Sequence, residues 1–241
     1  DVTYFVTKGL PVYADDVFST YLYTGNHSSQ SINNGIDLSG EGGLVWIKAR
    51  TSPSNNHELC DTVNGIDKGL SSNNTQYNVA TTVTAFNNDG FDISNSGWYS
   101  NNSNDVDYVS WTFRKAPGFF DIQTWTGNGG SARTINHDLG GQPGFIIVKR
   151  TDASGDSFVW HHDGLFTERY FHLNSTSQAD ATPLLAGGYV SGVSTSSFGL
   201  YDFGSGMANI NANGGTYVAY IFAHDNARFG ENGDESIIKC G

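Results

Sequence analysis

Positive charge is scarce in this 241-residue chain, in which 12 lysine and arginine residues stand against 24 aspartate and glutamate residues. The net charge of -12 would repel a phosphate backbone, because nucleic-acid binding depends on basic groups that displace counterions. We therefore expect no nucleic-acid ligand. The chain also lacks any apolar run near the roughly 18 residues that a bilayer-spanning helix needs, so we expect no membrane insertion.

Cysteine and methionine are nearly absent, with two cysteines and one methionine. Cys60 and Cys240 lie far apart and belong to no CxxC or cysteine–histidine spacing, which gives no support to a redox or metal role. We expect free thiols, and a disulfide between the two is the alternative. Leucine, glutamate, lysine and arginine, which favour helices, are thinly spread, so the chain shows no sign of a helical domain.

Glycine, asparagine, serine, threonine and aromatic residues dominate instead, with 30 glycines and 13% aromatics. Gly and Asn reach positive φ at little cost, whereas Tyr, Phe, Val and Thr suit a pleated surface. Val109, Trp111 and Phe113 alternate with smaller or more polar residues, the period of a strand with one buried face. Residues 44–47 and 145–148 are apolar throughout, which indicates central strands covered on both faces. The sequence predicts an all-β fold.

The second half of the chain repeats the first, and matched segments recur in the same order. The pairs are 20–26 with 122–128, 31–33 with 134–136, 43–48 with 144–149, 68–73 with 169–174, 88–91 with 196–198, and 107–113 with 216–222. Because each copy has short strands separated by turn signals, we expect two tandem β-sandwich or jelly-roll-like modules. The alternative is one larger concanavalin A-like sandwich formed from both halves.

We place the first module at 16–115 and the second at 118–225, joined by a short linker that contains Pro117. Residues 1–15 are expected to be the end of a preceding segment. Residues 226–241 are expected to be a linker and possible first strand of a third module, because Ile237 and Ile238 suit that strand. The linker is too short for freely moving domains, so we expect the modules to pack together.

Three stretches carry a resemblance to a known group of proteins: residues 42–48, 107–117 and 215–225. Together they resemble the tandem modules of large virion structural proteins of tailed bacteriophages of marine bacteria, the cyanophages and their relatives. Residues 235–241 look like the lead into a further module of such proteins. The resemblance covers the chain from Asp16 onward, and it implies a lectin-like virion component, such as a tail fibre or tail tip, without enzymatic activity.

A carbohydrate site is the most credible binding function in the residue pattern. Sugars stack on aromatic rings beside amide, carboxylate and backbone groups. Trp98 and Tyr99 lie in a polar loop, and Trp125 lies on a strand opposite the polar Thr124 face, so these three rings are the candidate glycan-binding residues.

Other chemistry has weaker support. The run 160–163 offers two histidines and an aspartate to a metal. Adjacent strand residues point to opposite faces, so His161 and His162 are not expected to converge unless the backbone turns there. Calcium is a further possibility for the loop carboxylates Asp89, Asp92, Asp105 and Asp107. Glu58 with Asp61, or Asp89 with Asp92, could form the acid pair of a glycosidase, but acids are plentiful in so acidic a chain.

The leading hypothesis is a non-enzymatic module of a virion appendage that contacts other virion proteins and binds host-surface glycans. The alternative is a purely structural decoration or scaffold protein of the head or tail. A polysaccharide depolymerase ranks below both. Because fibres are usually symmetric, we expect a homo-oligomer, with a trimer as the working guess.

Overall fold

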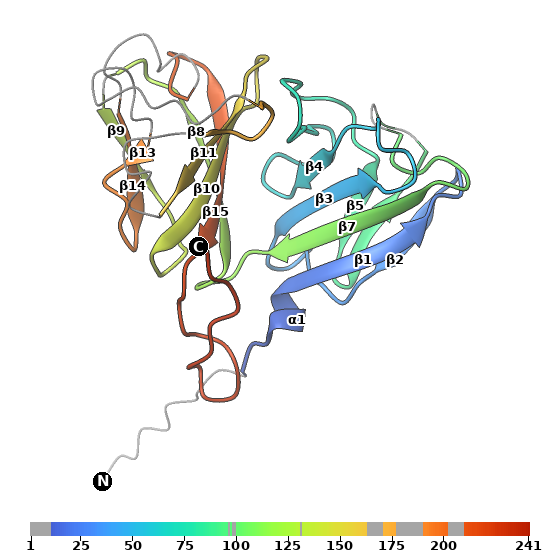
Figure 1. Ribbon diagram of the computed structural model, residues 1–241, viewed down its shortest axis with the longest axis horizontal. Coiled ribbons are helices and arrows are strands. Elements are labelled where there is room, and N and C mark those ends of the chain that lie inside the picture. The colour runs from blue at the N-terminus through green and yellow to red at the C-terminus, as the bar shows by residue number, and fades with distance from the viewer. Residues whose placement is uncertain are drawn as a thin grey trace.

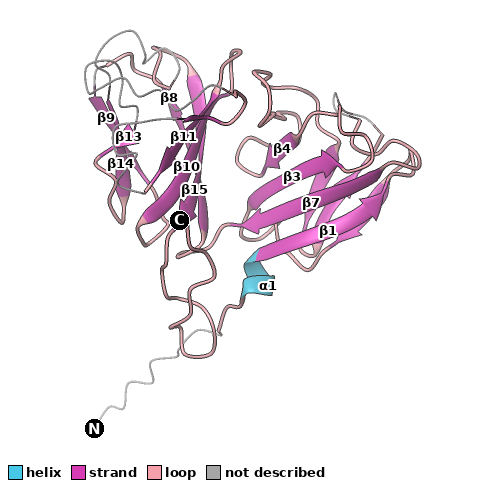
Figure 2. Ribbon diagram, viewed as in Figure 1, coloured by secondary structure: helices cyan, strands magenta, loops and turns pink. Residues whose placement is uncertain are grey.

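The computed structural model describes residues 11–95, 97, 100–130, 132–162, 171–176, 190–201 and 210–241. In these residues the chain forms antiparallel strands and a single-turn helix, α1 (Ala14–Val17), as Figure 2 shows. The all-β prediction is confirmed. Within the same residues no helix is long and apolar enough to cross a membrane.

The first half of the chain forms two sheets. The larger has the strand order β1-β7-β3-β4 and the smaller has the order β2-β6-β5. The strands are β1 (Phe18–Thr24), β2 (Gln30–Asn33), β3 (Gly43–Ala49), β4 (Glu58–Asp61), β5 (Val83–Asn87), β6 (Gly90–Ile93) and β7 (Asp107–Arg114).

The second half also forms a larger and a smaller sheet, with the orders β12-β11-β10-β15-β8 and β13-β14-β9. Its strands are β8 (Phe120–Thr126), β9 (Ala132–Asn136), β10 (Pro143–Arg150), β11 (Ser157–His161), β12 (Phe171–His172), β13 (Val190–Ser191), β14 (Ser197–Tyr201) and β15 (Thr216–Ala223).

The two halves share one topology. The order β1-β7-β3-β4 corresponds to β8-β15-β10-β11, and β2-β6-β5 corresponds to β9-β14-β13. Each half forms its own pair of sheets, and none of the described strands joins a sheet of the other half. The chain therefore has the two-sandwich form rather than that of one larger sandwich. We call residues 16–115 module 1 and residues 118–225 module 2.

Three apolar clusters hold four layers of sheet together. One cluster lies inside module 1, another inside module 2, and the third draws residues from both large sheets. The layers therefore run small sheet, large sheet, large sheet, small sheet, and in Figure 1 the two large sheets face each other. β3 and β10 sit in these large sheets and are almost wholly buried, which explains their continuous apolar runs.

A phenylalanine cluster, Phe18, Phe113, Phe120 and Phe222, joins the two modules. Phe18 packs on Phe113 with ring centroids 5.0 Å apart, and the equivalent pair Phe120 and Phe222 is 4.9 Å apart. Phe113 also contacts Phe120 at 5.6 Å and Phe222 at 5.3 Å across the interface. Each buried phenylalanine contributes about 1.5–3 kcal/mol, so the modules form one packed body.

Polar contacts cross the same interface. The phenol of Tyr220 donates to Asp61 Oδ2 at 2.8 Å, and both side chains are buried. Lys149 is 1% exposed, and its ammonium donates to the Asn74 carbonyl of module 1 at 3.0 Å. It also donates to the carbonyl of Gly155 at 3.1 Å. Burial lowers the pKa of Lys149 to about 8.

A Thr-Gly-Asn segment occurs in each module, at residues 24–26 and 126–128. In each case the preceding residue is aromatic and stacks on a second ring. Tyr23 stacks on Tyr108 with centroids 5.1 Å apart and planes at 15°, and Trp125 stacks on Tyr217 at 5.6 Å and 16°. Tyr23 donates its hydroxyl to the Asn101 carbonyl at 2.8 Å, and Trp125 donates Nε1–H to the equivalent carbonyl of Ile210 at 3.0 Å. Tyr and Trp are interchangeable here because each places one donor at the end of a flat apolar ring.

A buried asparagine completes this corner in each module. Asn102 and Asn211 have no exposed surface. Asn102 Oδ1 accepts the N–H of Asn26 at 3.1 Å, and Asn211 Oδ1 accepts the N–H of Asn128 at 3.2 Å. The recurring asparagine of each Thr-Gly-Asn segment thus satisfies a buried amide that would otherwise cost free energy.

The segment after module 2 folds back against both modules. Phe229 pairs with Glu235 in an isolated bridge, and the Gly230 N–H donates to the Val12 carbonyl at 2.9 Å. Ile238 packs against the module 2 core and the cluster between the modules. Residues 236–241 form no strand here, so the strand expected at this point is not formed, and the third module stays a prediction.

Alanine at Gly25 or Gly127 is expected to destabilise the fold by about 1–3 kcal/mol, the usual cost of overpacking. A Cβ at either position would collide with a backbone carbonyl, that of Ser103 or that of Ala212. Urea unfolding measures the effect. Gly155→Ala is the control, because its Cβ would meet only Arg150 at 3.6 Å. Equal stability of all three variants would contradict this account.

Tyr220→Phe is expected to lower the free energy of unfolding by about 1–3 kcal/mol, because a buried carboxylate oxygen of Asp61 loses its phenol donor. Tyr21→Phe is the control, since that ring is 37% exposed. Thermal unfolding compares the two variants with the wild-type chain. A loss no greater in Tyr220→Phe than in Tyr21→Phe would show that the contact between modules contributes nothing.

Candidate functional site

The face of the large module 2 sheet that packs on module 1 changes from apolar to polar along its strands. On β8, Phe120 and Ile122 are buried, whereas Thr124 and Thr126 are exposed. Alternate residues of a strand share a face, so both threonines continue the interface beyond its apolar part. On β15 the exposed Thr216 lies opposite Thr126 in the strand pairing. The sheets therefore separate at this end around a polar surface.

The loop that follows β4 in module 1 forms the opposite wall. Asp61 Oδ1 accepts the N–H groups of Val63 at 2.9 Å and Asn64 at 2.8 Å, which fixes the turn. Its other oxygen is bound to Tyr220 of module 2. One buried carboxylate thus shapes the loop and also attaches it to the facing module, so the wall is held in place before any ligand arrives.

We call the space between these walls the inter-module cleft, and its volume is about 420 Å³. Its lining comprises Val63, Asn64, Lys68, Thr124, Trp125, Thr126, Thr151, Thr216 and Tyr217. Among the described residues that form the lining, most are polar and none carries a carboxylate, imidazole or thiol. The lining offers hydroxyl, amide and ammonium groups for hydrogen bonding but no acid–base pair.

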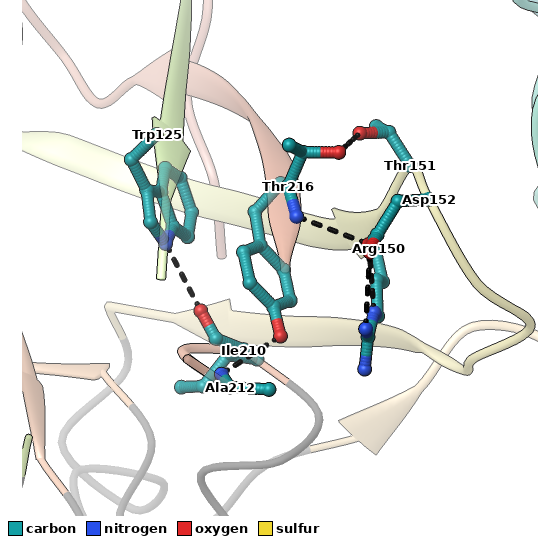
Figure 3. Close-up of polar contacts among 8 residues, drawn as sticks. Trp125, Arg150, Thr151, Asp152, Ile210, Ala212 and Thr216 are labelled. Carbon is teal, nitrogen blue, oxygen red and sulfur yellow. Dashed lines mark hydrogen bonds and ion pairs between the residues drawn. The ribbon is translucent and has the colours of Figure 1, made fainter. Parts of the chain in front are cut away.

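Hydrogen bonds order the rim of the cleft, as Figure 3 shows. The hydroxyls of Thr151 and Thr216 are 2.6 Å apart, and the Thr216 N–H donates to Asp152 Oδ1 at 3.0 Å. Arg150 donates Nε–H to the same oxygen at 2.8 Å. This contact lowers the pKa of Asp152 and raises that of Arg150, so both stay charged. The rim is therefore a fixed network.

Trp125, predicted as a sugar-stacking ring, lines the cleft but is only 6% exposed. One face of its indole lies on Tyr217, and its N–H is taken by Ile210. The ring serves the fold as the counterpart of Tyr23 and offers no open face to a sugar. The other two predicted rings, Trp98 and Tyr99, lie outside the described residues.

The acids weighed as a glycosidase pair are structural. Glu58 is fully buried, and its carboxylate accepts the Thr82 N–H at 2.6 Å and the Asn101 amide at 2.7 Å. Burial raises the pKa of Glu58. Asp61 is 1% exposed, and its two carboxylate oxygens accept hydrogen bonds from its own loop and from Tyr220. Neither acid faces the cleft.

The backbone turns after His161, which is the condition under which His161 and His162 were expected to converge. β11 ends at His161, so the chain leaves the strand there and the two rings lie 5.0 Å apart. The His162 ring also contacts that of His224 in a tilted arrangement, with centroids 3.8 Å apart, and its Nε2 contacts the Cys240 carbonyl at 2.6 Å. Over the described part of the chain, no three histidine, cysteine, aspartate or glutamate residues are placed to hold a metal ion.

The carboxylates weighed for calcium do not gather either. Asp89 accepts the Gly35 N–H, and Asp92 and Asp107 accept bonds from nearby side chains on their own sheets, while Asp105 takes part in a turn at positive φ. Each is used locally. Both cysteines are free, with Cys60 buried in module 1 and Cys240 partly exposed.

The threonines that line the cleft were not predicted from the sequence as site residues. Their signal is present in the sequence, because Thr124 and Thr126 occupy the positions where the apolar set of β8 should continue. In the sequence pattern, Thr124 serves only to mark the polar face opposite Trp125. Recognising the threonines themselves requires knowing that two modules face each other at this surface.

Acidification is expected to destabilise module 1 through His57. Its Nδ1 accepts the indole N–H of Trp46 at 2.8 Å, and burial and the charge of Lys48 lower its pKa to about 4. The imidazole of the unfolded chain titrates near pH 6.5. The contribution of neutral His57 to the free energy of unfolding is therefore fully present above that pH and is lost as the pH falls towards 4. Urea unfolding across this range should show the loss.

His57→Gln supplies the control for that titration, since an amide oxygen can accept the same indole N–H without titrating. The difference in unfolding free energy between wild type and His57→Gln should shrink or reverse as the pH falls. A difference that stays constant from pH 7 to pH 4 would contradict the role given to His57.

Comparisons with known proteins bear on the whole chain. A search of curated proteins and a search of solved structures each found no match. A family described as a domain of unknown function, DUF7483, matches residues 14–231 and so includes both modules and the cleft between them. This chain belongs to the DUF7483 family.

Proposed function

We propose that this protein is a non-enzymatic module of a bacteriophage virion appendage, and that its inter-module cleft binds a glycan of the host surface. The observation that carries the proposal is the chemistry of the cleft. Four threonine hydroxyls, the Asn64 amide and the Lys68 ammonium point to a ligand rich in hydroxyl groups. Such a ligand exchanges its hydrogen bonds with water for bonds to these groups.

The rigidity of the cleft supports this role. The Thr151–Thr216 bond, the Arg150–Asp152 pair and the Asp61 turn set the lining in one geometry. A preformed site loses little side-chain entropy on binding, which matters for sugars because their individual contacts are weak. The lining has no acid–base pair, so the bound sugar would be held rather than cleaved.

The virion assignment rests on the resemblance of residues 42–48, 107–117 and 215–225 to phage structural modules. A location on the particle surface suits a weak sugar site, because several copies of an appendage bind one cell together and gain avidity. A homotrimer with other virion proteins as partners is the corresponding assembly.

A second candidate function is a purely structural decoration or scaffold protein. One observation favours it. β1 is an edge strand of the large sheet of module 1, and it exposes Tyr21 at 37% and Leu22 at 57%. Edge strands with exposed apolar side chains are suited to pairing with another chain. In that case the exposed edge of β1, rather than the cleft, would be the functional surface.

Replacing cleft hydroxyls by methyl groups is expected to weaken glycan binding. Thr126→Val with Thr216→Val keeps the side-chain shape and the β propensity while it removes two hydrogen-bonding groups. Each lost bond costs about 0.5–1.5 kcal/mol, so affinity should fall roughly 5-fold to 150-fold for the pair. Binding of the wild-type chain and this variant to an array of bacterial surface glycans is the measurement.

Thr20→Val is the matched control, because Thr20 is an exposed strand threonine of β1 outside the cleft. It should bind like the wild-type chain. If the wild-type chain binds no glycan while cross-linking joins β1 to other virion proteins, the structural candidate replaces the glycan proposal. Reducing ends released from polysaccharide would instead indicate an enzyme.

A further inference from the structure

A second cavity lies where the linker between the modules meets both ends of the described chain. We call it the junction pocket, and its volume is about 330 Å³. It is lined by Val12, Glu41, Arg114, Lys115, Ala116, Pro117, Arg228 and Phe229. It shares no residue with the inter-module cleft, and the glycan proposal does not use it.

The junction pocket is unusually basic for this chain. Three of the 12 lysine and arginine residues line it, against one acid, Glu41, in a protein whose net charge is -12. Glu41 is 59% exposed at the rim, whereas the Arg114 side chain is 15% exposed. Positive charge concentrated in a concave site against a negative background attracts anions.

Arg114 has unused hydrogen-bonding capacity. Its Nε is buried and has no hydrogen-bond partner, and its Nη1 lies 3.8 Å from Glu41, too far for a hydrogen bond. A buried guanidinium donor is costly to leave unpaired. An oxyanion in the pocket would pair with the Arg114 guanidinium charge, and planar guanidinium groups are well matched to carboxylate, sulfate and phosphate oxygens.

The Arg228 side chain lies against the linker, and a backbone carbonyl, not a carboxylate, accepts its hydrogen bond. Its side chain lies on Gly118, and its Nη2 donates to the Gly140 carbonyl at 2.7 Å. In the described residues no carboxylate is within ion-pair distance of its guanidinium. Lys115 differs, because it is paired with Asp121 at 3.1 Å. The two arginines are therefore the groups that an anion would meet.

We propose that the junction pocket is an oxyanion-binding site, in which Arg114 and Arg228 bind a carboxylate, sulfate or phosphate group. Such a group is carried by an acidic or sulfated sugar or exists as a free inorganic ion. Because the linker, Val12 and the segment around Phe229 meet here, a bound oxyanion would also fasten the two modules and the C-terminal segment together.

Thermal unfolding of the 241-residue chain tests the site. Sodium chloride is replaced at constant ionic strength by sodium sulfate, sodium phosphate or sodium glucuronate, which keeps general charge screening equal. Sulfate and phosphate raise the stability of most proteins. The decisive quantity is therefore the extra rise in Tm of the wild-type chain over Arg114→Met and Arg228→Met.

The wild-type chain should show this extra rise, since an oxyanion at ten times its Kd raises the folding equilibrium constant about 11-fold. Arg50→Met, which removes an exposed cation outside the pocket, should respond like the wild-type chain. A response to glucuronate assigns the site to acidic sugars, and a response to sulfate and phosphate alone assigns it to the inorganic or ester groups. Equal responses in all four proteins overturn the proposal.

Glu41→Gln provides a test in the opposite direction that does not depend on how well the arginine variants fold. It removes the one negative charge of the lining, so calorimetric titration with the oxyanion that gives the largest rise should show tighter binding than in the wild-type chain. Weaker or unchanged binding in Glu41→Gln would contradict an oxyanion site between Arg114 and Arg228.

Discussion

The apolar contact between the two large sheets is the constraint on which the rest of the structure depends. Each module closes one core between its own sheets, but the outer face of its large sheet is also apolar and must be covered. The phenylalanine cluster meets that need by pairing Phe113 of one copy with Phe222, its counterpart in the other. The inter-module cleft and the junction pocket are the two places where this packing ends, so both sites exist because the modules face each other.

Much of the architecture was readable from the residues because it depends on local period and on repetition. The continuous apolar runs of β3 and β10 predicted strands buried on both faces, and the structure has them. Alternation in β7 also predicted a strand correctly, but the prediction of a single buried face was wrong, because Ser110 and Thr112 are fully buried whereas Trp111 is partly exposed. The repeated Thr-Gly-Asn segment marks a real corner, built from an aromatic stack and a buried asparagine. What the pattern could not supply was the mutual orientation of the copies, since an apolar face does not say which surface will cover it.

The candidate sites were less predictable for the same reason. Aromatic rings bind sugars, which is why Trp125 is a candidate, but a ring on a strand usually belongs to the core. The Trp125 ring stacks on Tyr217, and its N–H donates to the Ile210 carbonyl. The threonines around it and the Arg114–Arg228 pair come from segments distant in sequence, so no motif joins them. His161 and His162 show the limit of strand alternation, which holds only while the strand lasts, and β11 ends between them.

The face-to-face packing of equivalent surfaces has a consequence for how such a chain can be extended. In this contact Phe113 packs on Phe222, its counterpart in the other module, so the two large-sheet faces cover each other. A third copy would find the large-sheet faces of the first two already occupied, so it would need a fourth copy as its partner. A polypeptide with more copies would cover every such face only if the copies came in pairs, and the span matched by the family contains one such pair.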